Sequence, residues 1–238
     1  MEKLLTQLTE KLKDAFERRL VSVTLYGSAA AGEHNRSFSD LNVFCVVTEL
    51  TSRELADSEP VFRWWREQGH PSPLLMSREE VLHSTDSFPI EFLDMRERRR
   101  VLYGEDIVAE LQIDDRYHRA ELEHELRSKL LRLRQKATAV LSDREMLVRL
   151  MADSASTFLV LIRHSLLAAR KEAPRQRRAL LAAAGEAFCF EPRALYTLVD
   201  LREEKKKARE IDAIPLLDQY MGEIQAVIAA VDRQEQEQ

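Results

Sequence analysis

LYGSAAAGEHNRSFSDLNVF, residues 25–44, is the stretch that decides how the whole sequence is interpreted. It joins two segments with the composition of β-strands. Residues 21–26 (VSVTLY) are rich in β-branched and aromatic side chains and end at Gly27, and residues 41–47 (LNVFCVV) form a second apolar run. Short apolar runs bounded by glycine and polar residues are typical of strands. We therefore predict two strands joined by a glycine turn and a polar connection.

Four residues of this stretch suit a ligand that carries phosphate. Gly27 lets the backbone turn tightly and approach a ligand. Ser28 is suited to cap a short helix, whose free N–H groups bind anions. Asp40 and Asn42 are two positions apart on a strand, so their side chains share one face. Oxygen ligands beside a phosphate cradle are what Mg²⁺-nucleotide chemistry requires.

A third carboxylate is expected from a neighbouring strand. Residues 88–95 (FPIEFLDM) have the pattern of a third strand, in which Glu91 lies on the face opposite Ile90 and Phe92. Asp94 competes for the role from the opposite strand face. Structural roles alone also explain these residues, because Gly27 with Ser28 makes an ordinary strand-to-helix turn and an edge strand leaves Glu91 in solvent.

The order Gly-Ser, a gap of about ten residues, Asp-x-Asp/Glu and a later strand carboxylate resembles the nucleotidyltransferase superfamily, which has the DNA polymerase β-like fold. The chain is most similar to the bacterial stand-alone type, such as aminoglycoside nucleotidyltransferases and minimal nucleotidyltransferases with a C-terminal helical domain. The resemblance covers residues 20–105. It departs from the family pattern at Asn42, where relatives carry a second acidic ligand, and at Ala31, where many carry a basic residue.

The resemblance implies a role for each matched position. Ser28 and the backbone after Gly27 would hold the β- and γ-phosphates of a nucleoside triphosphate. Asp40 and Asn42 would bind Mg²⁺, and Glu91 would be a third metal ligand or the general base. The implied reaction is transfer of a nucleoside monophosphate, AMP from ATP in the first instance, to a hydroxyl group, with pyrophosphate as the second product.

Asn42 leaves a second function open. An amide oxygen contributes no charge, so it weakens Mg²⁺ binding and the neutralisation of the transferred phosphate. The alternative is a catalytically degenerate nucleotide-binding or interaction protein on the same scaffold. The hydroxyl acceptor is also open, and a small molecule, a protein or an RNA end would all serve.

Composition divides the chain of 238 residues into two halves. Residues 1–113 carry a net charge of −6 and residues 114–238 one of +1, which together give the formal charge of −5. We predict an α+β fold, with a small mixed sheet and helices in residues 1–113 and an all-α helical bundle in residues 114–238. Apolar runs are too short to cross a membrane and the first residues are not a signal peptide, so we expect a soluble cytoplasmic protein without membrane partners.

The helical half carries weaker functional hints. The apolar segment 147–169 is suited to bury itself in the bundle or to form a homodimer. Arg119 and His124 match the Arg-x4-His spacing of HEPN ribonucleases, but they lie near the start of the first bundle helix and an ordinary charged helix face explains them better. The run of lysines at 205–207 closes a predicted helix, where it complements the helix dipole, and the balanced charge of this half leaves room for a local basic patch.

Overall fold

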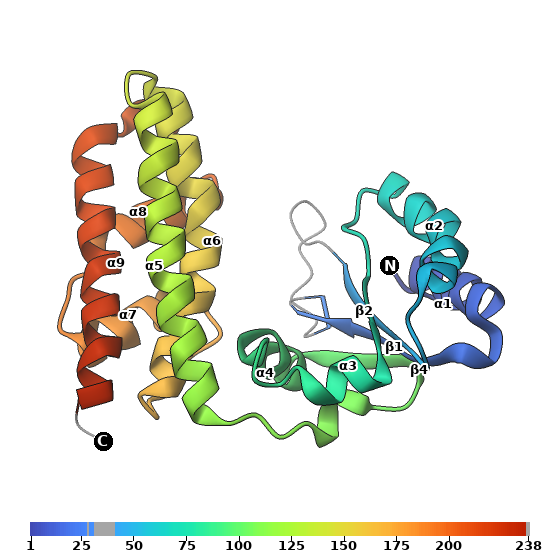
Figure 1. Cartoon of the computed structure of the whole chain (residues 1–238). Helices are drawn as coiled ribbons and strands as arrows, with labels where there is room; N and C mark the ends of the chain where they lie inside the picture. The colour runs from blue at the N-terminus through green and yellow to red at the C-terminus, as the bar shows by residue number, and fades with distance from the viewer. Residues whose placement is uncertain (28, 31–40, 237–238) are drawn as a thin grey trace. The chain divides into compact units, whose positions relative to one another are not determined.

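The computed structural model describes residues 1–27, 29–30 and 41–236 of the chain. Ser28, residues 31–40 and residues 237–238 lie outside the described part. The chain divides into two compact units, Met1–Tyr117 and His118–Gln238, which Figure 1 shows as a sheet-containing unit and a helical unit. Each unit is described by itself.

A four-stranded mixed sheet forms the centre of the first unit. Its strands are β1 (Leu20–Tyr26), β2 (Asn42–Val47), β3 (Leu74–Ser77) and β4 (Arg99–Gly104), in the spatial order β3-β2-β1-β4. β1 is antiparallel to both β2 and β4, whereas β2 and β3 are parallel. The two strands expected on either side of the glycine turn are therefore present and adjacent, and the α+β fold class is confirmed.

Apolar side chains along β2 point alternately to the two faces of the sheet, and each face has its own core. Val43, Cys45 and Val47 pack with the apolar stripes of α1 (Glu2–Phe16) and α2 (Ser52–Glu67). Phe44 and Val46 point the other way, into the core that contains residues of α3 (Arg78–His83) and α4 (Pro89–Glu97). Successive strand residues face opposite sides, so Asn42 lies on the same face as Phe44 and α4.

The tryptophan pair of α2 divides between core and surface. Trp65 is fully buried in the core formed with α1, and Trp64 is partly buried with the ammonium of Lys11 over its ring at 5.1 Å. Their positions assign both rings to packing between helices.

The prediction of a strand over residues 88–95 is wrong, because this segment forms the helix α4. A short apolar run fits both structures by periodicity alone. Pro89 occupies the first turn of α4, a position that favours proline, and Phe92 and Met95 are one turn apart and buried. The strand that follows, β4, was not predicted, because its sequence RRVLYG begins with two arginines and lacks a long apolar run.

The second unit is helical. Its helices are α5 (Asp115–Val140), α6 (Arg144–Ala168), α7 (Arg177–Phe188), α8 (Arg193–Arg202) and α9 (Ala213–Gln236). Short 3₁₀ turns occur at Glu17–Arg19, Ile107–Glu110 and Ala208–Glu210 in the chain as a whole. α6 begins after the N-cap Asp143, whose side chain accepts a hydrogen bond from Met146 N at 3.0 Å.

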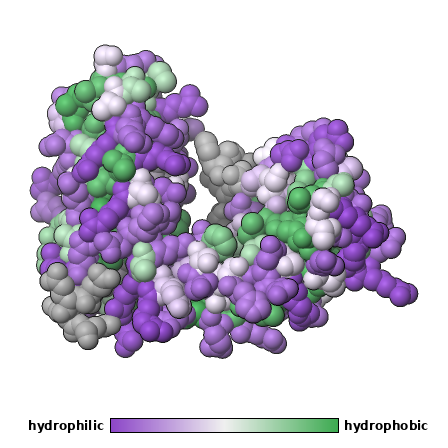
Figure 2. All heavy atoms as spheres, viewed as in Figure 1, coloured by the Kyte–Doolittle hydropathy of each residue, from purple (hydrophilic) through white to green (hydrophobic). Residues whose placement is uncertain are grey.

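Polar side chains cover most of the visible surface of each unit in Figure 2. Among the described residues, exposed large apolar side chains of the helical unit include Leu131, Leu141 and Met146. No helix in the described part of the chain is long and apolar enough to cross a membrane.

Candidate functional site

The candidate site lies where β1 ends and β2 begins. Tyr26, the last residue of β1, pairs with Asn42, the first residue of β2. Gly27 follows with a φ of +79°, a conformation that costs other L-residues about 1 kcal/mol or more. Its N–H donates to the carbonyl of Arg98 at 2.9 Å, and its own carbonyl accepts from Ala30 N at 3.1 Å. The chain therefore turns sharply at the point where the sequence predicts it.

Asn42 lies directly against this turn. A Cβ atom placed on Gly27 would be 3.4 Å from Asn42 Nδ2. Asn42 is half-buried and is on the sheet face that α4 covers. The structure thus brings together Gly27 and Asn42, the two members of the predicted motif that it describes.

The other two members of the motif, Ser28 and Asp40, lie outside the described residues. Their roles in phosphate and metal binding stay predictions. Within the described part of the chain, no three His, Cys, Asp or Glu side chains are grouped so that they could hold a metal ion.

Glu91 reaches this region from a helix instead of a strand. It lies in the first turn of α4 and is exposed. Burial raises the pKa of Tyr26 above its ordinary value, and the negative charge of Glu91 raises it further, which places Glu91 within electrostatic reach of the end of β1. On a helix, Glu91 and Asp94 are three positions apart and share one side, so Asp94 is not on an opposite face as predicted for a strand.

The described strands contribute no carboxylate to the site. None of the residues of β1, β2, β3 or β4 is Asp or Glu. β4, the neighbour of β1, instead places Arg99 opposite Tyr26. Of the described acidic residues, Glu91 on α4 is the one whose charge acts on Tyr26, and it is therefore our candidate for the carboxylate that the motif requires.

The arginines at the start of β4 are held by ion pairs. Arg99 donates to both carboxylate oxygens of Asp106, at 2.7 and 2.9 Å, and holds the pKa of Asp106 below its usual range. Arg100 pairs with Glu2 at 3.0 Å. These contacts fix β4 against the rest of its unit. The sequence shows this cluster as a basic run, but only the structure shows that it belongs to the sheet.

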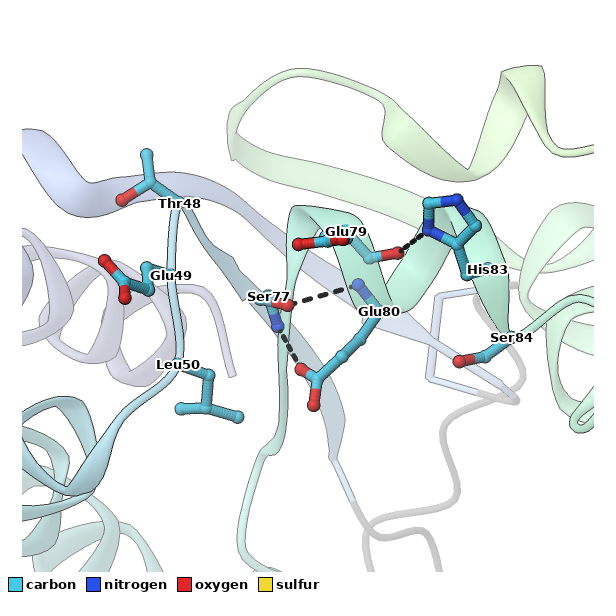
Figure 3. Close-up of a pocket in the computed structure, with 8 residues that line it drawn as sticks. All are labelled: Thr48, Glu49, Leu50, Ser77, Glu79, Glu80, His83 and Ser84. Atoms are coloured by element: carbon cyan, nitrogen blue, oxygen red, sulfur yellow. Dashed lines mark hydrogen bonds between the residues drawn. The ribbon is translucent and has the colours of Figure 1, made fainter.

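A pocket of about 460 Å³ opens at the opposite end of the sheet (Figure 3). β2 and β3 are parallel, so their carboxyl ends meet at this edge, where Thr48 follows β2 and Ser77 ends β3. The full lining is Thr48, Glu49, Leu50, Ser77, Glu79, Glu80, His83 and Ser84.

Hydrogen bonds within this pocket stabilise the start of α3. Glu80 Oε2 accepts from Ser77 N at 2.7 Å and Ser77 Oγ accepts from Glu80 N at 3.1 Å, and these two bonds form a capping box. His83 Nδ1 lies 2.9 Å from the carbonyl of Glu79. Several polar side chains of the pocket thus serve local structure.

In the helical unit, the sequence drew attention to His124, but the structure shows a buried pair formed by two other histidines. His124 is exposed on α5. His118 and His164 are both buried and lie 2.9 Å apart, Nε2 to Nδ1, between α5 and α6. The sequence holds one hint of this pair, because His118 precedes Leu122 by four residues and extends the buried stripe of α5.

No protein-family model matches the chain, and no curated protein matches it by sequence. Among solved structures, the chain is similar to that of a spectinomycin adenyltransferase from Enterococcus faecialis, determined with ATP and spectinomycin. The alignment has a TM-score of 0.50 and 11% identity, and it covers 97% of this chain and 99% of the other.

The chain has the nucleotidyltransferase fold. The similarity extends through the helical half, because almost the full length of both chains is aligned. It confirms the predicted fold and the predicted resemblance.

Proposed function

We propose that this protein binds a nucleoside triphosphate at the Gly27–Asn42 end of its sheet and transfers the nucleoside monophosphate to a hydroxyl acceptor. The observation that carries the proposal is the contact between the positive-φ turn at Gly27 and the side chain of Asn42, in a fold shared with an enzyme that was solved with ATP. That neighbour supports ATP as the triphosphate.

Each residue has a distinct part in the proposed reaction. The backbone after Gly27 and the hydroxyl of Ser28 bind the β- and γ-phosphates. The acceptor oxygen bonds to the α-phosphorus of ATP while the bond from that phosphorus to the bridging oxygen of the β-phosphate breaks, and pyrophosphate leaves. Glu91 accepts the proton of the acceptor hydroxyl. Most of the rate enhancement would come from positioning and from electrostatic stabilisation.

The donor set at this end suits Mg²⁺. The amide oxygen of Asn42 and the carboxylate of Asp40 are hard oxygen ligands of the kind that Mg²⁺ prefers. A bound Mg²⁺ would supply positive charge next to the phosphates. Asn42 contributes an oxygen without charge, so its substitution by aspartate should strengthen the site.

Transfer is tested by following pyrophosphate release from ATP in the presence of pooled hydroxyl acceptors. Glu91→Gln should lower the rate by about 100-fold or more, the usual contribution of a general base. Asp94→Asn, one turn along the same helix, is the matched control and should keep most of the activity. Equal rates in wild type and Glu91→Gln would contradict the assigned role of Glu91.

A second function is favoured by one observation, the absence of Asp and Glu from the described strands together with Asn42 at the position of an acidic ligand. In this alternative the protein binds nucleotide without transferring it and acts through a partner. ATP binding by wild type and by Asn42→Asp, with no pyrophosphate from either, would support the alternative over transfer.

A further inference from the structure

Positive charge is concentrated in two segments of the helical unit. Residues 170–178 (RKEAPRQRR) precede and begin α7, and residues 200–207 (DLREEKKK) end α8 and follow it. Together they contain nine cations and four anions, a net charge of +5 in a chain whose net charge is −5. We call these two segments the α7–α8 cationic surface.

Contacts between α7 and α8 bring the two segments together. Arg178 forms an ion pair with Asp200, and Arg177 Nη1 lies 3.9 Å from Glu203 Oε1. The hydroxyl of Tyr196 donates to the carbonyl of Arg178 at 3.3 Å. These links join the N-terminus of α7 to the C-terminal half of α8 (orange in Figure 1), although the segments are about twenty residues apart in sequence.

Several cations of this surface are not used by the fold. Arg175, Lys206 and Lys207 are exposed and form no ion pair with any residue that the structure describes. The backbone that carries the lysine run is tied to the end of α8, because the carbonyl of Asp200 accepts from Lys205 N at 2.8 Å and from Lys206 N at 3.3 Å.

The dipole of α8 explains the lysines at its C-terminal end, but it does not explain the other cations of this surface. The dipole acts mainly within the last turn of a helix, and it gives no account of Arg175 or Arg177, which lie at the N-terminus of α7, where cations are unfavourable. Arg175 in particular is exposed beside the positive end of the α7 dipole and has no ion pair with the described residues, so its charge is available to negative charge from outside the chain.

One aromatic contact indicates the kind of polyanion. The guanidinium of Arg178 lies over the ring of Tyr196, 5.6 Å from its centroid, and Tyr196 is half-buried. Arginine and aromatic rings on a positively charged surface are the usual components of nucleic-acid binding. An acidic peptide would use the cations but has no particular use for the ring.

We infer that the α7–α8 cationic surface binds the phosphate backbone of a nucleic acid. The cations come from two segments and are exposed on long side chains, so a ligand with repeated phosphates engages several of them at once. The inference stands on the helical unit alone and does not depend on nucleotidyl transfer.

The test is fluorescence anisotropy of a labelled single-stranded RNA with the full chain, between about 50 and about 200 mM salt. Wild type should bind with an affinity that falls steeply with salt. The triple variant Arg175→Ala, Lys206→Ala, Lys207→Ala should bind about tenfold or more weakly, and its salt slope should be smaller by about 2, since each phosphate contact on a single strand contributes about 0.7.

A second triple variant, Arg132→Ala, Arg134→Ala, Lys136→Ala, is the matched control. It removes the same charge from α5, where these three side chains are also exposed and in no ion pair with the described residues. The control should bind RNA like wild type. Equal weakening in both triple variants, no wild-type binding at the lowest salt, or displacement of the RNA by polyglutamate as effectively as by unlabelled RNA would overturn the inference.

Discussion

The two ends of the small sheet differ in what they are built to do. At one end, Gly27 and Asn42 meet in a turn with a positive φ, and the nearby acidic residue Glu91 is exposed on a helix. At the other end there is a pocket of about 460 Å³, but Ser77 and Glu80 in it bond to each other. We therefore place the proposed site at the Gly27–Asn42 end, where a residue other than glycine would be strained, and not at the pocket.

The largest contrast between the ends should come from glycine substitution. Gly27→Ala and Gly69→Ala both force alanine into a positive φ, +79° and +87°, so both should lose about 1 kcal/mol of stability. Only Gly27 has a site residue beside it, because a Cβ on Gly69 would meet nothing within 4 Å. We expect ATP affinity to fall about tenfold or more in Gly27→Ala and to stay at the wild-type level in Gly69→Ala, as measured by calorimetry. Equal affinity in the two variants would remove the functional meaning of the turn.

Substitution in the pocket at the other end should change stability and leave nucleotide binding intact. Ser77→Ala removes the N-cap of α3 and should cost about 1 kcal/mol in urea unfolding. Its ATP affinity should equal that of wild type. A loss of ATP binding without a loss of stability would reverse the assignment of the two ends.

A smaller effect, on the pH dependence of stability, is expected in the helical unit. There Glu223 on α9 caps the N-terminus of α8. Its carboxylate accepts from Ala194 N at 2.7 Å and from Leu195 N at 2.9 Å, and burial raises its pKa to about 6. A carboxyl group with a raised pKa binds more protons in the folded state than in the unfolded state. Its contribution to stability is therefore fully present below about pH 4.5 and is lost as the pH rises through about 6.

Glu223→Gln removes this titration. The free energy of unfolding of wild type, relative to that of the variant, should decline as the pH rises across that interval. Urea unfolding at several pH values measures it, and nucleotide binding should not follow the same curve. A constant difference between the two proteins at all pH values would show that Glu223 titrates normally.

The sequence predicted the parts of the fold that have strong local patterns. β-branched residues and a following glycine were sufficient for β1 and the turn, and helical periodicity was sufficient for α1 and the helices of the second unit. The prediction failed at residues 88–104 for two reasons. The run FPIEFLDM fits both a strand and a helix, and the arginines that begin β4 are not typical of a strand. Tertiary contacts decide there, through the packing of Phe92 on Phe44 with ring centroids 6.3 Å apart.

The candidate site was predictable in part for the same reason. β1 and β2 are neighbouring strands, so Asn42 at the start of β2 lies beside Tyr26 and the glycine that follows it, and the two predicted strands were enough to bring Gly27 and Asn42 together. Glu91 was chosen as a strand carboxylate and reaches the end of β1 from α4, so its residue number was inferred on an incorrect structural basis. The buried pair of His118 and His164 was missed, because 46 residues separate the two and no local pattern joins them.

Calorimetric titration of ATP, with and without Mg²⁺, into wild type, Asp40→Ala and Asn42→Asp tests the central claim most directly. Binding at the Gly27–Asn42 end should require Mg²⁺, should be lost in Asp40→Ala and should tighten in Asn42→Asp, since the second carboxylate restores charge at the metal. Absence of ATP binding in all three proteins, or equal binding in all three with and without Mg²⁺, would contradict a metal-nucleotide site at this end of the sheet.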